Sequence, residues 1–230
     1  MQIIEQTGFG VRSAVLTLES PAHQARFIVF PMLHLAMPSF YQAVRRGLQD
    51  CDQIVVEGVA GNRTRLMTLA YRTAGRLGRG GLVDQGTGLD LSAFADRLVR
   101  PDMTAAEFAS GWRRVSRGLR WTVLLLTPAI GVWMAVVGPR RALGSNVAVD
   151  QEPTREEEEM ADATETWDQL IVDERDRALC AALVRLAAEA SEPRTVGVCW
   201  GAQHVRAVVR VLMGDLGYRI VDATWVTVMD

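Results

Sequence analysis

Four side chains in this sequence have the types and positions that chemistry at one site would need. His34 follows the apolar run FIVF, Glu57 ends the run QIVVE, and His204 follows TVGVCWG. Two imidazoles and a carboxylate that meet in a crevice form the ligand set of a catalytic divalent metal, with one position open for water. Each residue also has a structural alternative, because such histidines often cap or pack and such carboxylates often cap a helix.

The fourth residue, Arg175 in the run ERDR, stands four positions before Leu179 and eight before Leu183. That spacing places it on the apolar face of a helix. A buried arginine either pairs with a buried carboxylate or holds a substrate oxyanion, and the sequence leaves both readings open. Glu57 has the opposite need, since a carboxylate among apolar neighbours is desolvated unless a positive group meets it.

The surrounding pattern predicts elements that would bring these residues together. Short runs rich in β-branched and aromatic residues alternate with amphipathic runs, which indicates an α/β or α+β fold with a mixed central sheet flanked by helices. Ligands in such folds bind outside the carboxyl ends of the strands. The predicted strands are 13–18 and 26–30 (a hairpin), 53–57, 81–85, 195–199 and 218–228. The predicted helices are 38–50, 63–78, 90–99, 104–120, one beginning near 167, and 204–217.

Composition narrows the possible functions. At 230 residues the chain is expected to form a single domain, 1–230, and a net charge of −2 gives no sign of a nucleic-acid partner. The sequence contains no lysine, which excludes P-loop, pyridoxal and Schiff-base chemistry. Its 3 cysteines form no CxxC pair. No signal peptide is recognisable at the N-terminus, so we expect a cytoplasmic protein, possible membrane contact aside.

The stretch 121–138 carries no charge and is close to the length of about 20 residues that spans a bilayer. Pro128 and Gly131 are expected to interrupt it, and arginines flank both ends. Two readings stay open: a buried helical hairpin or homo-oligomer interface, and membrane contact that spans the bilayer or lies on it. With the acidic run that follows, the stretch belongs to a predicted helical insertion over 90–165.

Three segments together resemble a known family. They are LHLAMPSFYQAVRRGLQDCDQIVVEG, VDERDRALCAAL and GAQHVRAVVRVLMGDLGYRI, within residues 26–60 and 165–222. They look like the TraB, PrgY, GumN and Tiki family, which is distantly related in fold to erythromycin esterase and ChaN. The family has two Gly-x-x-His motifs, a glutamate that ends a strand, and an arginine in an "ERn" or "ERd" sequence. Gly201 to His204 match the second motif, whereas Pro31 replaces the glycine of the first.

The resemblance implies a metal-dependent hydrolase of peptide or ester bonds with an erythromycin esterase/ChaN-like fold. Tiki members are Mn- or Co-type proteases, and the esterase relatives cleave an ester. We therefore expect His34, Glu57 and His204 to hold Mn, Co or Zn, with Arg175 stabilising the oxyanion. In a variant of this mechanism Glu57 is the general base. The alternative is a non-catalytic protein that binds or sequesters a peptide or small ligand.

Overall fold

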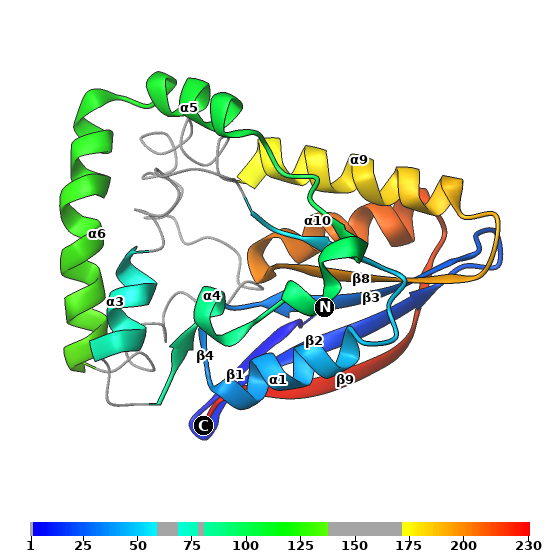
Figure 1. Ribbon diagram of the computed structural model, residues 1–230, viewed down its shortest axis with the longest axis horizontal. Helices are drawn as coiled ribbons and strands as arrows, with labels where there is room; N and C mark the ends of the chain where they lie inside the picture. Colours follow the sequence, from blue (N-terminus) through cyan, green and yellow to red (C-terminus); the bar gives the residue numbers. More distant parts are fainter. Residues whose placement is uncertain (1, 59–68, 78–80, 138–171) are drawn as a thin grey trace.

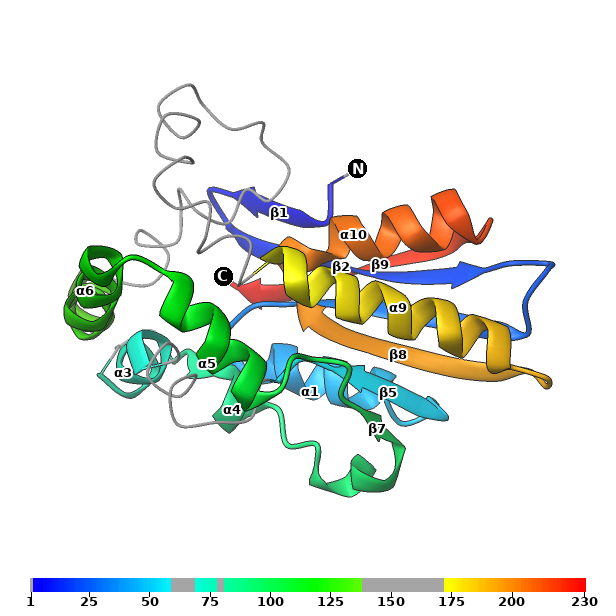
Figure 2. The same ribbon diagram turned by 90° about the horizontal axis from the view of Figure 1, so that it is seen from above.

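The computed structural model of this chain describes residues 2–58, 69–77, 81–137 and 172–230, and side chains in all of these except 69, 77 and 134–137. Within them the chain forms a mixed α/β structure, with one large sheet between helices (Figures 1 and 2). The predicted α/β class with a mixed central sheet is confirmed. The finer assignment, an erythromycin esterase/ChaN-like fold, stays a prediction.

The main sheet combines parallel and antiparallel strands. Its strands are β1 (Ile4–Thr7), β2 (Gly10–Glu19), β3 (Ala25–Met32), β5 (Gln53–Val56), β7 (Leu98–Val99), β8 (Arg194–Gly201) and β9 (Arg219–Met229). The order β3, β8, β5, β7 is parallel throughout, whereas β2 runs antiparallel to β1, β3 and β9. The four parallel strands therefore end at the same edge of the sheet. The predicted hairpin is confirmed as β2 and β3, with Leu16 opposite Val29.

Helices cover both faces of the sheet. One face carries α1 (Pro38–Gly47), and the other carries α9 (Glu174–Glu189) and α10 (Val205–Val209) (Figures 1 and 2). Four further helices belong to the described residues: α3 (Leu69–Leu77), α4 (Gln85–Gly88), α5 (Ala105–Arg114) and α6 (Arg117–Val137). α9 buries Leu179, Leu183 and Leu186, as its spacing predicts. On the α1 face, a Cβ at Gly197 would lie 2.7 Å from Leu48, so glycine allows the close packing there.

The helix predicted over 90–99 is wrong. A 3₁₀ helix, Ser92–Arg97, is followed by strand β7, which pairs with β5 through Ile54–Leu98 and Val55–Val99. Two residues are too few to show a strand period in sequence, so pairing with β5 decides the conformation of this segment. β7 also brings into the main sheet two residues from the range predicted as an insertion, 90–165. Residues 138–165 of that range lie outside the described residues.

The helix predicted over 104–120 is two helices, because Val115 is extended (ψ 137°) and buried between α5 and α6. The Ser116 hydroxyl accepts the Leu119 N–H at 3.3 Å, as an N-cap does.

The predicted interruption at Pro128 and Gly131 is also wrong, because α6 is continuous and contains Pro128. A Cβ at Gly131 would lie 2.8 Å from the Ala70 carbonyl oxygen, so this glycine lets α6 approach α3. The buried hairpin is therefore excluded. Within the described residues, no helix combines the length and hydropathy of a bilayer-crossing segment.

A small two-stranded sheet lies beside the main one. It pairs β4 (Leu35–Ala36) with β6 (Val83–Asp84), and Leu35 is opposite Asp84. The predicted strand over 81–85 is thus confirmed in its central part. Because β3 ends at Met32 and β4 begins directly after His34, the two strands hold the chain on either side of that histidine.

Candidate functional site

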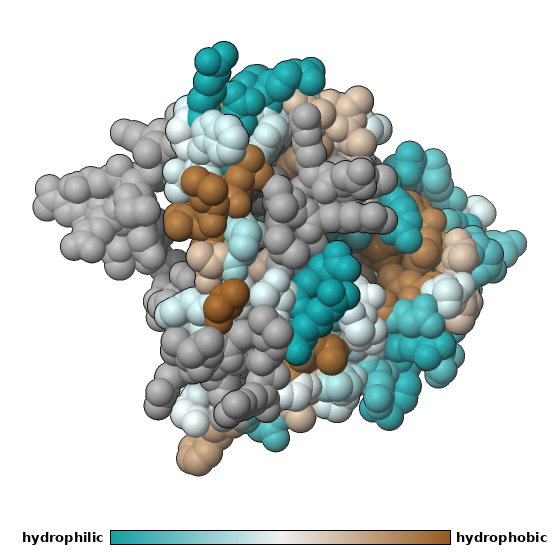
Figure 3. Space-filling model, turned by 60° about the vertical axis from the view of Figure 1, so that its left-hand side comes forward, coloured by the Kyte–Doolittle hydropathy of each residue, from teal (hydrophilic) through white to brown (hydrophobic). Residues whose placement is uncertain are grey.

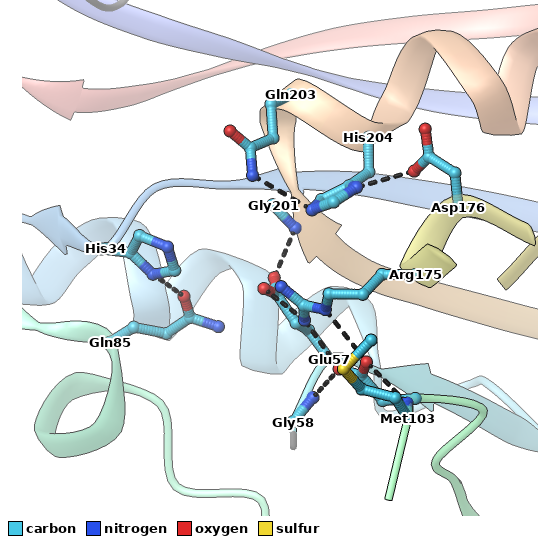
Figure 4. Close-up of polar contacts among 11 residues, drawn as sticks. His34, Glu57, Gly58, Gln85, Met103, Arg175, Asp176, Gly201, Gln203 and His204 are labelled. Carbon is cyan, nitrogen blue, oxygen red and sulfur yellow. Dashed lines mark hydrogen bonds and ion pairs between the residues drawn. The ribbon is translucent and has the colours of Figure 1, made fainter. Parts of the chain in front are cut away.

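The four predicted residues lie at the carboxyl edge of the parallel strands. His34 follows β3, Glu57 follows β5, and His204 follows β8 through a short 3₁₀ turn. Arg175 enters the same region from the first turn of α9 (Figure 4). Arg175, His34 and His204 each act electrostatically to lower the pKa of Glu57, so all three lie within electrostatic reach of its carboxylate.

Arg175 is the centre of a buried ion network. Its Nε donates to Asp102 Oδ1 at 2.9 Å and its Nη2 to Asp102 Oδ2 at 2.6 Å, while Nη2 also donates to Glu57 Oε1 at 2.8 Å. The side chains of Arg175, Glu57 and Asp102 are 10%, 13% and 1% exposed. The arginine thus pairs with buried carboxylates, one of the two readings that the sequence left open. Its guanidinium also lies 5.8 Å from the centre of the Trp200 ring.

The backbone completes the bonding of both carboxylates. Gly201 N–H donates to Glu57 Oε2 at 2.8 Å, and the N–H groups of Gly58 and Met103 donate to the two oxygens of Asp102 at 3.0 and 2.9 Å. A Cβ at Gly201 would lie only 3.1 Å from Glu57 Oε2. The glycine of the second motif therefore allows the backbone to approach this carboxylate closely, whereas its φ of −51° would suit any residue.

The charged and hydrogen-bonded partners of Glu57 and Arg175 shift the pKa values of both groups. Burial by itself would raise the pKa of Glu57. The electrostatic influence of Arg175, His34 and His204 and the hydrogen bond from Arg175 lower it by a larger amount, so the pKa lies below its ordinary value. Burial lowers the pKa of Arg175, and its bonds to Asp102 and Glu57 outweigh that, so the net shift is upward. Glu57 is consequently ionised at neutral pH and Arg175 carries its charge.

His204 is fully buried and is held by a carboxylate that directly follows the arginine in sequence. Its Nδ1 lies 2.6 Å from Asp176 Oδ1, and its Nε2 lies 3.1 Å from the side-chain nitrogen of Gln203. An ionised carboxylate only accepts hydrogen bonds, so Asp176 favours the tautomer with the proton on Nδ1. The lone pair of Nε2 then accepts from the Gln203 amide (Figure 4).

His34 has neutral partners instead. Its Nδ1 lies 3.2 Å from Gln85 Oε1, and its ring is 4.9 Å from that of Tyr71 on α3. Burial and the Glu57 charge raise the pKa of Tyr71, which links this side of the site to the carboxylate. His34 and Tyr71 line a cavity of about 450 Å³ together with Arg72, Asp84, Gln85, Gly86 and Thr87.

Pro31, the departure from the first motif, lies inside β3 rather than in the turn. It pairs with Trp200 in the parallel register, and its carbonyl oxygen accepts the Ser13 hydroxyl at 2.8 Å. Positive φ values among the described residues occur only at glycines, none of them in this turn. The proline therefore fits an extended strand, where neither a positive φ nor its missing N–H is required.

In this arrangement, two of the three predicted metal ligands are already hydrogen-bonded to other groups. Among the described residues, no three His, Cys, Asp or Glu side chains are grouped closely enough to hold an ion. Both Glu57 oxygens are hydrogen-bonded, to Arg175 and to Gly201, and His204 Nδ1 is bonded to Asp176. Metal binding by His34, Glu57 and His204 stays a prediction.

Sequence reasoning missed Asp102, Asp176, Tyr71 and Gln85 as members of this site. Asp102 follows β7, the strand that was mistaken for helix, so its place at the carboxyl edge could not be inferred. Asp176 had a signal, because it adjoins Arg175 and stands in the first turn of α9. Asp84 lies in β6, and its carboxylate accepts a hydrogen bond from the Thr87 hydroxyl at 2.6 Å.

We compared the chain with known proteins. No protein-family model, no curated protein and no solved structure matches it. The TraB and Tiki resemblance therefore rests on the motifs alone and stays a prediction.

Proposed function

We propose that this chain hydrolyses an ester or peptide bond at the carboxyl edge of β3, β8 and β5. The observation that carries the proposal is the 2.6 Å contact between Asp176 and His204, beside the Arg175–Glu57 ion pair. A carboxylate that fixes the tautomer of a histidine leaves the other ring nitrogen basic, which is the arrangement of a general base. The cavity of about 450 Å³ beside His34 is large enough for a small substrate or one side chain of a peptide.

In the proposed reaction, Nε2 of His204 takes a proton from water as the oxygen attacks the substrate carbonyl carbon. The Gln203 side chain, which is exposed, must rotate away from Nε2 to admit that water. Nη1 of Arg175 donates to the carbonyl oxygen as it becomes negative, while Nε and Nη2 keep their bonds to Asp102 and Glu57. The imidazolium then returns its proton to the leaving alcohol or amine as the acyl bond breaks.

Glu57 acts in this scheme through Arg175 and Gly201. With one oxygen on each, it holds the guanidinium and the turn before His204 at a fixed separation. It is a positioning residue, and the alternative role of Glu57 as general base would require its bond to Arg175 to open.

A divalent ion on His34, Glu57 and His204 remains part of the proposal from sequence, but no step above is assigned to it. Such an ion would have to displace Arg175 and Gly201 from the Glu57 oxygens. Elemental analysis after dialysis against Mn, Co and Zn tests it directly. Near-stoichiometric metal in the wild type and none in His204→Ala would support the ion, and no metal in either protein would remove it.

Activity is tested with a panel of activated esters and short peptides. We expect His204→Gln and Asp176→Asn each to lower kcat by 10²- to 10⁴-fold, the range of a lost general base. His23→Gln is the matched control, because His23 stacks on Tyr218, away from the site. Turnover that survives in both site variants would contradict the proposal.

A second candidate function is favoured by one observation, the saturation of the ion network. Every Glu57 and Asp102 oxygen has a partner, and His204 is fully buried. Such a network also suits a protein that only binds a peptide or small ligand in the cavity beside His34. This candidate requires no turnover on any substrate, and it requires Glu57→Gln to change stability more than any measured binding.

A further inference from the structure

The side of α6 that faces solvent is unusually apolar. Trp121, Leu125, Leu126, Ile130, Val132 and Trp133, here called the α6 outer face, are between 45% and 69% exposed to solvent among the described residues. A helix that is apolar on all sides is normally buried in protein or in lipid. Figure 3 brings this side of the molecule forward, and hydrophobic side chains reach its surface there.

The inward side of the same helix is already used. Val123 and Leu124 pack on the cluster that contains Phe108 and Val115, and Gly131 approaches α3 closely. α6 is thus anchored to the domain along its length, with its axis held across the end of the molecule in Figure 1. The α6 outer face is the side of the helix turned away from these contacts.

Charge at one end of α6 indicates what this surface meets. Arg113 and Arg114, which are exposed, end α5, and Arg117, exposed, and Arg120, half-buried, stand in the first turn of α6. Among described residues, Glu174 lies near one of them, 3.4 Å from Arg114. A second copy of the chain would bring the same positive charge to the contact, whereas anionic lipid headgroups would neutralise it.

The two tryptophans support the same occupant. Trp121 and Trp133 stand near opposite ends of the α6 outer face and are 64% and 51% exposed. Tryptophan favours the boundary between headgroups and acyl chains, where its ring is buried and its N–H stays hydrated. Because no described helix could cross a bilayer, the contact is one that lies in the plane of the surface.

We propose that the α6 outer face docks in the plane of an anionic membrane surface, with the arginines at the start of α6 contacting lipid phosphates. The docking is independent of the proposed hydrolase, because the α6 outer face shares no residue with the site at the strand ends. It would present the edge of the sheet that carries His34 and His204 beside a lipid surface.

Co-sedimentation of the full chain with vesicles tests the proposal. Vesicles of phosphatidylcholine with phosphatidylglycerol should bind the protein at least tenfold more tightly than pure phosphatidylcholine, and 0.5 M salt should weaken that preference. The double variant Trp121→Gln/Trp133→Gln should lose tenfold or more. Arg117→Gln should lose about fivefold on anionic vesicles only, since each arginine near such a surface contributes about 1 kcal/mol.

Phe9→Gln is the matched control, because Phe9 is 92% exposed in the turn between β1 and β2 and should not change binding. Two results would overturn the proposal. One is a dimer, detected by analytical ultracentrifugation, that Leu125→Glu dissociates while no vesicle binding is found, which would assign the face to a second copy. The other is a monomer that binds no vesicle, which would mean that another part of this chain covers the face.

Discussion

His204 and His34 follow neighbouring parallel strands at the same edge of one sheet, yet their surroundings differ. His204 is fully buried against the carboxylate of Asp176 and stands beside the Glu57–Arg175–Asp102 network. His34 is half-buried against the neutral side chains of Gln85 and Tyr71, at the wall of a cavity. One side of the site is thus held by paired charges, and the other is held by neutral contacts and is open to a ligand.

The comparison teaches that strand position brings a histidine to an edge, but its partners decide what it can do there. The strand register contributes to the difference. Trp200 is opposite Pro31 and Gly201 is opposite Met32, so the two x-x-His turns start one position apart. Only Gly201 meets a carboxylate.

The largest expected difference between the two sides is in stability. Asp102→Ala leaves Arg175 short of its bidentate partner and two backbone N–H groups without an acceptor, which should cost about 3–5 kcal/mol. Gln85→Ala, on the His34 side, should cost about 1 kcal/mol, because it removes one neutral hydrogen bond. Urea unfolding of both variants measures the gap, and equal costs would break the comparison.

A smaller effect is expected from Gly201→Ala. The new Cβ would meet Glu57 Oε2 at 3.1 Å, so the carboxylate or the turn must shift, at a cost of about 1–3 kcal/mol. Gly214→Ala is the control, because a Cβ there meets nothing within 4 Å. If the two substitutions proved equally mild in thermal unfolding, close approach would not be the reason for glycine at position 201.

The charged side should also make stability depend on pH. The pKa of Glu57 is lower in the folded protein than its ordinary value of 4.5, so its contribution is fully present above that pH and is lost as the pH falls through the folded value. One proton changes the free energy of unfolding by at most about 1.4 kcal/mol per pH unit. Glu57→Gln should therefore flatten the acid limb of a urea-derived stability profile below about pH 5, and an unchanged limb would contradict this assignment.

The smallest stability effect is expected at the histidine of the neutral side. His34→Asn removes a half-buried ring and one 3.2 Å contact, and should change the free energy of unfolding by less than about 1 kcal/mol. If the cavity beside His34 holds the substrate, the same variant should raise KM more than it lowers kcat. A large loss of stability would place His34 with the structural residues instead.

Much of the fold could be predicted because its signals are local. The hairpin 13–30, the strand that ends at Glu57 and the apolar face of α9 each carry their period in the sequence. The convergence of His34, Glu57, Arg175 and His204 at one edge then follows from the parallel order of the strands. Strand β7 could not be predicted, because two residues show no period, and Asp102 was missed with it.

The sequence by itself determined which residues are available for chemistry: no lysine, 3 histidines, and a glutamate and an arginine that burial forces to find partners. Only the tertiary structure decided which residues pair with this glutamate and this arginine. Asp102 reaches Arg175 across 73 positions of chain, and Glu57 reaches it across 118. The physical reason is that the cost of burying an unpaired charge can be recognised from the local sequence. Which opposite charge compensates it depends on which strands pair and which helix packs across their ends.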